Sequence, residues 1–480
     1  MSNSKVSLKE RTFYGIMWSG VERFSVGGIM FLLQIVMARM LSPEDYGIVG
    51  MLAIFVAVAQ SFVDSGFSNA LIQKNDRTEL DYSTVFYFNV VVGCVFYLLL
   101  FFSSPFIASF YKTPILLELT RVIGLSILFN SLTVVQRAKM TIAIDFKTQT
   151  KASFLAVVLS GVLGIWMAYA GCGVWAIAIQ TVSNTGLNMI LLWIYSSWKP
   201  KKVFSWNSFH RLFSFGSKLL LAGLIDTIYR NIFTLIIGKK FTKVELGNYT
   251  RADQFCQFPS ANITGILQRV TFPILSELQN DDERLKLVYR KFLRLSAFVI
   301  FPLMIGLAAI SRPFILLVLT EKWEGAIVLM QVLCLGYLWY PIHAINLNLL
   351  QVKGRSDLFL RLEIIKKSVG IGILFVTIRY GVLTMCMGTI VGGIIGLIFN
   401  TYYTGKLIQL GFVKQMLDLF PILINSIVMG GLVYFLTCLL SGYMLQILLG
   451  SIGGIIYYLL SSHIFHSQDL KYLFSLVKRK

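Results

Sequence analysis

The chain has 480 residues, of which 56% are hydrophobic and only 14% are charged. A soluble domain carries about a quarter charged residues, so this composition excludes an ordinary soluble protein and is typical of the membrane class. The net charge of +20 suggests nucleic acid at first, but the basic residues form no single soluble face with interleaved aromatic residues. We therefore expect no nucleic-acid partner.

Apolar stretches follow one another along most of the chain. A helix needs about 20 apolar residues to cross a bilayer, and we predict about 14 such stretches. They lie at 13–38, 47–70, 82–103, 115–136, 152–170, 173–196, 213–238, 246–272, 292–318, 326–350, 358–378, 382–404, 417–439 and 443–462. Because the bilayer core cannot satisfy an open strand edge, these stretches must be helices. The predicted fold is an all-α polytopic membrane protein.

The basic residues are concentrated in alternate loops. With the N-terminus inside, few lysines and arginines lie outside, and this asymmetry predicts that both termini are cytoplasmic. The first residues show no small-residue cleavage pattern, so we expect an uncleaved first helix. The inside set includes Lys5, Lys9, Arg11, Lys139, Lys147, Lys151, Lys199, Lys201, Lys202, Lys286, Arg290, Lys291, Arg355, Lys366, Lys367 and Lys478.

The chain repeats itself weakly. Residues 39–47 match residues 239–247 in the order of basic, apolar, hydroxyl, acidic and glycine positions, at an offset of 200 (239 − 39). Later matches pair Gln73–Asp76 with Gln279–Asp282, and Gly173 with Gly381, so the offset reaches only 208 (381 − 173). Three matches in the same order indicate an internal duplication.

The repeat predicts two six-helix lobes, at 1–205 and 206–410. Residues 411–480 then hold two additional helices and a basic cytoplasmic tail. Since six is even, equivalent helices run in the same direction, as in a parallel repeat about an axis along the membrane normal. In transporters built this way the substrate site lies between the halves and is exposed alternately to each side.

Ionisable residues inside the predicted spans are costly and usually face a cavity or a partner. Arg23 lies near the middle of the first span, and Gln34 shares its helix face. Asp226 and Arg230, four residues apart on the seventh span, either line the path or neutralise each other.

The eighth span is the most polar, and a helix with its stripe of polar residues cannot face lipid. It contributes the substrate-binding candidates Arg251 and Asn262, and the coupling-ion candidate Asp253. Asp64 on the second span and Asp226 are further coupling-ion candidates, although a helix-packing hydrogen bond is the favoured role for Asp64. Arginine offers two parallel donors to phosphate oxygens and keeps its proton, so these residues favour an anionic head group with diphosphate character.

The sequence gives no sign of catalysis, a metal or a cofactor. The six cysteines are scattered with no C-x-x-C spacing, and the four histidines form no H-E-x-x-H motif. We therefore predict a transporter without catalytic residues, metal or cofactor.

The run Ala38–Gly47 resembles the A-R-x-L-x-P-x-x-[YF]-G signature of bacterial polysaccharide-biosynthesis flippases. These are the Wzx-like, lipopolysaccharide or colanic-acid-type members of the multidrug/oligosaccharidyl-lipid/polysaccharide exporter (MOP) superfamily. The segments Leu246–Ala252, Phe272–Ser276 and Gly354–Asp357 also match, and the resemblance covers the whole chain.

The resemblance implies transport of an undecaprenyl-diphosphate-linked oligosaccharide from the cytoplasmic to the periplasmic leaflet of a bacterial inner membrane. It implies that Arg23, Arg230 and Arg251 hold the diphosphate, that H⁺ or Na⁺ drives transport, and that polysaccharide-assembly proteins are partners. Three alternatives stay open: a multidrug-type small-molecule exporter, a peptidoglycan lipid-precursor flippase, and a membrane polysaccharide polymerase or ligase. The last would need a large extracytoplasmic loop, whereas the longest outside segment, 104–114, is short and hydrophobic.

Overall fold

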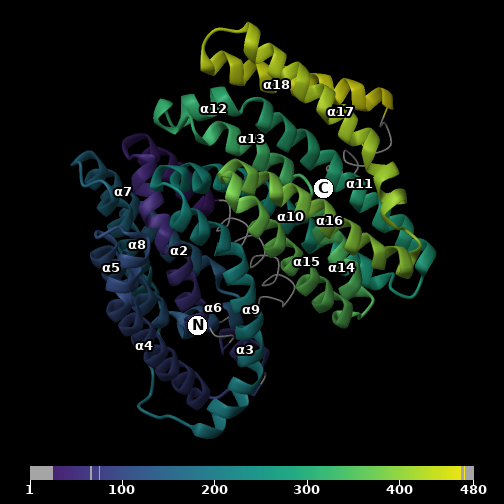
Figure 1. The fold of residues 1–480 in the computed structure, drawn as a ribbon. Coiled ribbons are helices and arrows are strands. Elements are labelled where there is room, and N and C mark those ends of the chain that lie inside the picture. The colour runs from purple at the N-terminus through teal and green to yellow at the C-terminus, as the bar shows by residue number, and fades with distance from the viewer. Residues whose placement is uncertain (1–24, 65–66, 75, 466–469, 471–480) are drawn as a thin grey trace, which may run out of the picture. The chain divides into compact units, whose positions relative to one another are not determined.

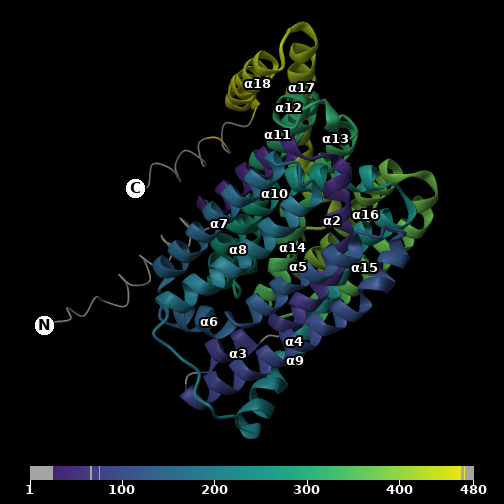
Figure 2. The ribbon, with the colours of Figure 1, turned by 90° about the vertical axis from the view of Figure 1, so that its left-hand side faces the viewer.

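The computed structural model describes the chain except for residues 1–24, 65–66, 75, 466–469 and 471–480. All regular elements in the described residues are helices, labelled in Figures 1 and 2. They are Ser25–Met40, α2 (Pro43–Asp64), α3 (Phe67–Gln73), α4 (Glu79–Tyr111), α5 (Leu116–Ser131), α6 (Val134–Ile142), α7 (Phe146–Tyr169), α8 (Val174–Tyr195), α9 (Trp206–Lys240), α10 (Lys243–Glu277), α11 (Asp282–Ala309), α12 (Ser311–Val318), α13 (Ala326–Tyr337), α14 (Tyr340–Val352), α15 (Ser356–Thr377), α16 (Val382–Ile408), α17 (Phe412–Leu439) and α18 (Tyr443–Phe465), with short 3₁₀ turns at Glu321–Trp323 and Ile378–Tyr380.

Ten helical segments of the described chain are long and apolar enough to cross a membrane. This finding confirms the all-α polytopic membrane protein. The helices also lie where the apolar stretches predict them. However, the ten do not include α9, α10 and α15, which are rich in polar and charged residues, and the number of about 14 crossings stays a prediction.

The chain forms two compact units, Met1–Gly247 and Asn248–Lys480. In the first unit α4 packs against α5, α7 against α8, and α2 against α9. One of its hydrophobic clusters joins Phe67 of α3, Tyr82 of α4, Trp198 of the α8–α9 connection and Leu212 of α9. These contacts hold α9 in the first unit. The lobe boundary at 205/206 concerns the sequence repeat, and it stays a prediction.

In the second unit α11 packs against α17, α15 against α16, and α17 against α18. Figures 1 and 2 show α17 and α18 side by side at the C-terminal end of the described chain. One predicted span is broken here: α13 ends at Tyr337 and α14 begins at Tyr340, with Pro341 in its first turn. Proline fits a first helical turn because its missing N–H is not needed there. The helix α10, in contrast, continues through Pro259 and Pro273.

Candidate functional site

The starts of α2 and α10 have the same local structure. In the first turn of α2, Asp45 accepts hydrogen bonds from the Ser42 backbone N–H (2.9 Å) and hydroxyl (2.7 Å), and the Asp45 N–H donates to the hydroxyl of Ser42 (3.2 Å). At the start of α10, Glu245 and Thr242 form the same three bonds at 2.9, 2.8 and 3.2 Å. Each arrangement is a capping box, in which the backbone N–H groups of both residues find a side-chain acceptor. The two boxes lie at the repeat offset of 200.

The same helix starts approach each other closely through two glycines. A Cβ on Gly47 would lie 1.9 Å from the Lys243 carbonyl oxygen, and one on Gly247 would lie 1.8 Å from the Pro43 carbonyl oxygen. Only glycine fits at either position, because any side chain would collide with backbone. An ion pair of 3.1 Å between the Lys243 Nζ and Glu44 Oε1 adds to this crossing. The glycines of the two matching segments thus have a structural role that their sequence pattern did not reveal.

The Asp226–Arg230 pair forms on α9 as its spacing predicts. The Arg230 Nε donates to the Asp226 Oδ2 at 2.7 Å, and the side chains are 59% and 43% exposed, respectively. Beside this pair, the hydroxyls of Ser61 on α2 and Thr227 on α9 lie 3.0 Å apart. The two groups therefore neutralise each other in this conformation.

Asp64, at the end of α2, is linked to its own helix. It accepts a hydrogen bond from the Gln60 Nε2 (3.2 Å), and the Gln60 Oε1 accepts one from Asn130 on α5 (3.0 Å). Arg137 on α6 lies close enough for its charge to act on Asp64. This chain of contacts fits the helix-packing interpretation of Asp64 and leaves its ion-binding role a prediction.

On α10, Arg251 is buried, with 7% of its surface exposed. Its Nη1 donates to the Gln254 Oε1 at 2.6 Å. Asn262, about three turns further along, donates from its Nδ2 to the Phe258 carbonyl (2.8 Å). The polar stripe of α10 therefore contributes one buried cation and one amide that bonds to its own helix.

Asp253 points to a different partner. Its Oδ1 accepts a hydrogen bond of 2.8 Å from the hydroxyl of Tyr337, the last residue of α13. The Tyr337 carbonyl in turn accepts a bond from the Ser260 hydroxyl of α10 (2.9 Å). Two hydrogen bonds thus join α10 to the point where α13 ends.

The remaining candidates are distributed over both units. Arg23 lies outside the described residues, and Gln34 is half-buried on the helix Ser25–Met40. Gln34, Asp64, Asp226 and Arg230 belong to the first unit, and Arg251, Asp253 and Asn262 belong to the second. Among the described candidates, Asp226 and Arg230 contact each other. A common binding site for the whole set stays a prediction.

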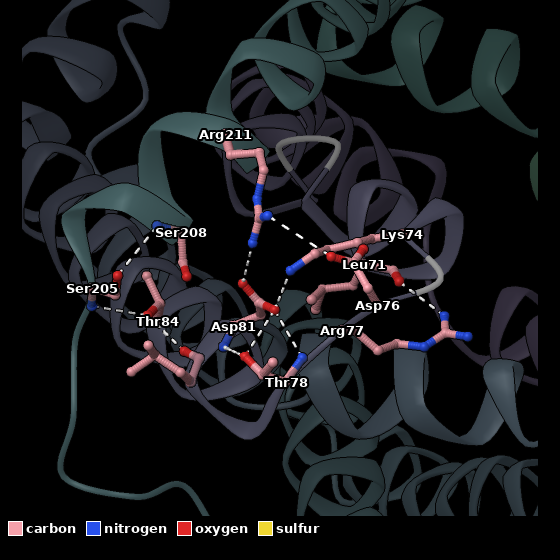
Figure 3. A network of polar contacts seen from close by, with 11 residues as sticks. Leu71, Lys74, Asp76, Arg77, Thr78, Asp81, Thr84, Ser205, Ser208 and Arg211 are labelled. Atoms are coloured by element: carbon pink, nitrogen blue, oxygen red, sulfur yellow. Dashed lines mark hydrogen bonds and ion pairs between the residues drawn. The ribbon is translucent and has the colours of Figure 1, made fainter.

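A polar cluster around Asp81 was not predicted from the sequence. Figure 3 shows Lys74, Thr78 and Arg211 pointing toward this carboxylate, which is fully buried. It pairs with Lys74, accepts bonds from the Thr78 N–H (2.8 Å) and hydroxyl (3.0 Å), and lies 3.4 Å from the Arg211 Nη2. Thr78 and Asp81 form a capping box at the start of α4. The spacing Thr-x-x-Asp before an apolar run was the signal that could have revealed it.

The same end of α4 holds the connection between α8 and α9. The Lys201 N–H donates to the Ser83 hydroxyl (3.0 Å), and the Ser205 N–H donates to the Thr84 hydroxyl (3.1 Å). The Trp198 indole donates to the Glu79 carboxylate at 2.6 Å. These bonds fix the entry of α9 into the first unit, so the cluster is a structural anchor.

The comparison with known families decides the identity. A family model described as "Polysaccharide biosynthesis protein" matches residues 36–328, which is more than half of the chain. The chain belongs to the polysaccharide biosynthesis protein family. It is therefore a membrane transporter of the polysaccharide-export type, the class that the sequence predicted.

Curated relatives agree with this assignment. The teichuronic acid biosynthesis protein TuaB of Bacillus subtilis is 29% identical over 355 residues, which cover 73% of either chain. The lipopolysaccharide biosynthesis protein WzxC of Escherichia coli is 25% identical over 367 residues, or 75% of this chain and 74% of WzxC. The chain is thus similar to the Wzx-like proteins that its signature segments resemble.

Solved structures define the fold. The lipid II flippase MurJ in an inward closed conformation superposes with a TM-score of 0.77 at 18% identity, covering 94% of this chain and 99% of MurJ. An inward-facing multidrug resistance MATE family transporter of the MOP superfamily superposes with a TM-score of 0.62 at 15% identity. The match covers 82% of this chain and 99% of the transporter. The polysaccharide biosynthesis protein therefore has the MOP superfamily fold.

Proposed function

We propose that this protein is a flippase that moves an undecaprenyl-diphosphate-linked oligosaccharide from the cytoplasmic to the periplasmic leaflet of a bacterial inner membrane, for surface polysaccharide biosynthesis. Its family supports a polysaccharide-related substrate. The likeness of its fold to a lipid II flippase supports a lipid-linked one. Flipping makes and breaks no covalent bond, so the protein needs only to bind the head group and expose it alternately to each side.

The observation that carries this proposal is the buried arginine of α10. Arg251 is 7% exposed in a protein of the membrane class, where an intramembrane charge is expensive and usually functional. A guanidinium stays protonated and donates two parallel hydrogen bonds, which fits the oxygens of a diphosphate. In the proposed site Arg23, Arg230, Gln34 and Asn262 act with Arg251 on the head group. Asp64, Asp226 and Asp253 are the candidates for H⁺ or Na⁺ coupling.

The proposed architecture has about 14 membrane crossings, in accord with the length of apolar helix that a bilayer requires. Two six-helix lobes, 1–205 and 206–410, are related by a parallel repeat, and 411–480 adds two helices. The matching capping boxes at Ser42–Asp45 and Thr242–Glu245 support the repeat. The asymmetry of lysines and arginines supports cytoplasmic termini.

A second candidate is a flippase for the peptidoglycan lipid precursor, because the fold resembles that of a lipid II flippase over 94% of this chain. Both substrates carry a diphosphate, so the buried Arg251 suits either. The two candidates differ in the glycan, and only the accumulating lipid distinguishes them.

Gene deletion followed by analysis of lipid-linked glycans tests the proposal. In the deletion strain, the lipid-linked repeat unit of the surface polysaccharide should accumulate on the cytoplasmic face and be cleared by the wild-type gene. Accumulation of the peptidoglycan precursor would favour the second candidate. If no lipid-linked glycan accumulates, the flippase proposal is wrong.

Complementation with matched variants extends the test to the residues. Arg251→Ala, expressed at the wild-type level, should leave the lipid uncleared. Arg284→Ala is the control, because the Arg284 side chain is 76% exposed and pairs only with Asp281 at the start of α11 among the described residues. It should clear the lipid like the wild type. Full clearance by Arg251→Ala would remove Arg251 from the proposed site.

A further inference from the structure

The hydrogen-bond partner of Asp253 is a neutral group, unlike the partners of Asp226 and Asp418. Asp226 pairs with Arg230 (2.7 Å), and Asp418 of α17 pairs with Arg290 of α11 (2.5 Å). For Asp253, in contrast, the part of the chain that the structure describes offers no lysine, arginine or histidine within 4.0 Å. Its hydrogen-bond partner there is the neutral hydroxyl of Tyr337.

Neutral groups with hydroxyl or thiol side chains lie around Asp253. Its carboxylate lies close enough for its charge to act on the phenols of Tyr249 and Tyr337 and on the thiols of Cys256 and Cys386. Both thiols are buried. Arg251 lies two residues away, about 200° around the helix, and so points to another face of α10.

This environment selects among the ions that could neutralise a carboxylate. An ionised carboxyl without a cation is costly in a low-dielectric site, and the group neutralises by binding a proton or a cation. Hard cations require several oxygen ligands, whereas sulfur ligands suit soft metals. Within the described residues, the one hydrogen bond to Asp253 comes from a phenol, and the thiols near it are poor ligands for a hard cation, so these neighbours favour a proton over Na⁺.

We propose that the Asp253 carboxyl, hydrogen-bonded to the Tyr337 hydroxyl, is the group that binds and releases the coupling proton. This assignment rests on the proposed function and selects one of its three coupling candidates. The step is the reversible addition of one proton to the carboxylate, and no other bond is formed or broken.

The position of Tyr337 explains how this proton acts on the fold. Tyr337 ends α13, and both its hydroxyl and its carbonyl bond to α10, through Asp253 (2.8 Å) and Ser260 (2.9 Å). A hydrogen bond to an ionised acceptor is roughly twice as strong as one between neutral groups. Protonation of Asp253 therefore weakens one of the two bonds that hold α10 to the helix break.

Infrared difference spectroscopy tests the proposal on the full-length protein in lipid vesicles, with no substrate present. Between acidic and alkaline buffer the wild type should show the carbonyl band of one protonated carboxyl in the protein interior. Asp253→Asn should abolish this band. Tyr337→Phe should retain the band at a shifted frequency, because the carboxyl loses its hydrogen-bond donor.

Comparison variants and a sodium titration make the result decisive. The band should persist in Asp226→Asn and in Asp64→Asn, and NaCl at constant pH and ionic strength should not remove it. Persistence of the band in Asp253→Asn, its loss in either comparison variant, or its removal by Na⁺ would overturn the assignment. Thermal unfolding of each variant checks that it is folded, and Tyr337→Phe supplies an independent readout if Asp253→Asn is not.

The spectroscopic result is separable from the flippase test. If the deletion strain accumulates no lipid-linked glycan but the Asp253 band titrates, the proton site stands and the substrate assignment fails. If the lipid accumulates but the band is insensitive to Asp253→Asn, the flippase stands and its coupling residue lies elsewhere.

Discussion

Substitution of Gly47 by alanine tests the crossing of α2 and α10. The added Cβ would lie 1.9 Å from the Lys243 carbonyl oxygen, whereas ordinary contacts begin at 3.4 Å. The two helix starts must therefore separate by 1.5 Å (3.4 − 1.9). The obstacle is backbone, so no side-chain rotation relieves it. Overpacking of this kind costs about 1–3 kcal/mol.

Thermal unfolding of the purified protein in lipid nanodiscs measures this cost. In a folding unit of roughly 150–250 residues, 1 kcal/mol changes the Tm by about 2–4 °C, so Gly47→Ala should lower it by roughly 2–12 °C. The control is Gly223→Ala on α9, where a Cβ has no neighbour within 4 Å. Alanine is the better helix former by about 1 kcal/mol, so the control should be as stable as the wild type or more stable.

The double variant Gly47→Ala/Gly247→Ala provides a sharper check of the geometry. Both added carbons press on the same crossing, at 1.9 and 1.8 Å from the opposite carbonyl oxygens. One separation of the helices relieves both, so the loss of stability should be smaller than the sum of the single losses. Wild-type stability of Gly47→Ala, or simple additivity in the double variant, would refute the close reciprocal contact.

Two further substitutions address charged groups. Asp81→Asn should destabilise the protein by about 3–5 kcal/mol, because it leaves the Lys74 ammonium, which is 9% exposed, without its buried carboxylate. The control is Asp76→Asn, at a side chain that is 79% exposed. It should change the Tm little in the same thermal unfolding assay. Arg251→Lys should bind the lipid-linked diphosphate more weakly than the wild type but more strongly than Arg251→Ala, because lysine keeps the charge and loses the paired donors. Equal binding by all three proteins in a titration with undecaprenyl diphosphate would contradict this role.

The helices could largely be predicted from the sequence, since each predicted apolar stretch overlaps a described helix. The break between α13 and α14 was signalled by Pro341. The break between α5 and α6, at Leu132–Thr133, had no such signal, because neither proline nor glycine lies there. A residue distant in the sequence contacts this break: the Trp193 indole of α8 donates to the Leu132 carbonyl at 3.0 Å.

In the candidate site, too, the contacts between residues close in sequence could be predicted and those between distant residues could not. The spacing of Asp226 and Arg230 was sufficient to predict their pair, because residues four apart share a helix face. Asp253 and Tyr337 are 84 residues apart, and Asp81 and Arg211 are 130 apart. Contacts at such separations depend on helix packing, which hydrophobic periodicity does not specify.

Transport of a lipid-linked oligosaccharide by the purified protein in proteoliposomes tests the central claim most directly. The lipid is placed in the inner leaflet, and a membrane-impermeant hydrolase outside cleaves only the molecules that have been flipped. The wild-type protein should make the lipid accessible faster than protein-free vesicles, and Arg251→Ala should reduce the rate toward that background. Equal rates with and without the wild-type protein, across both acidic-inside and acidic-outside pH gradients, would contradict the flippase assignment.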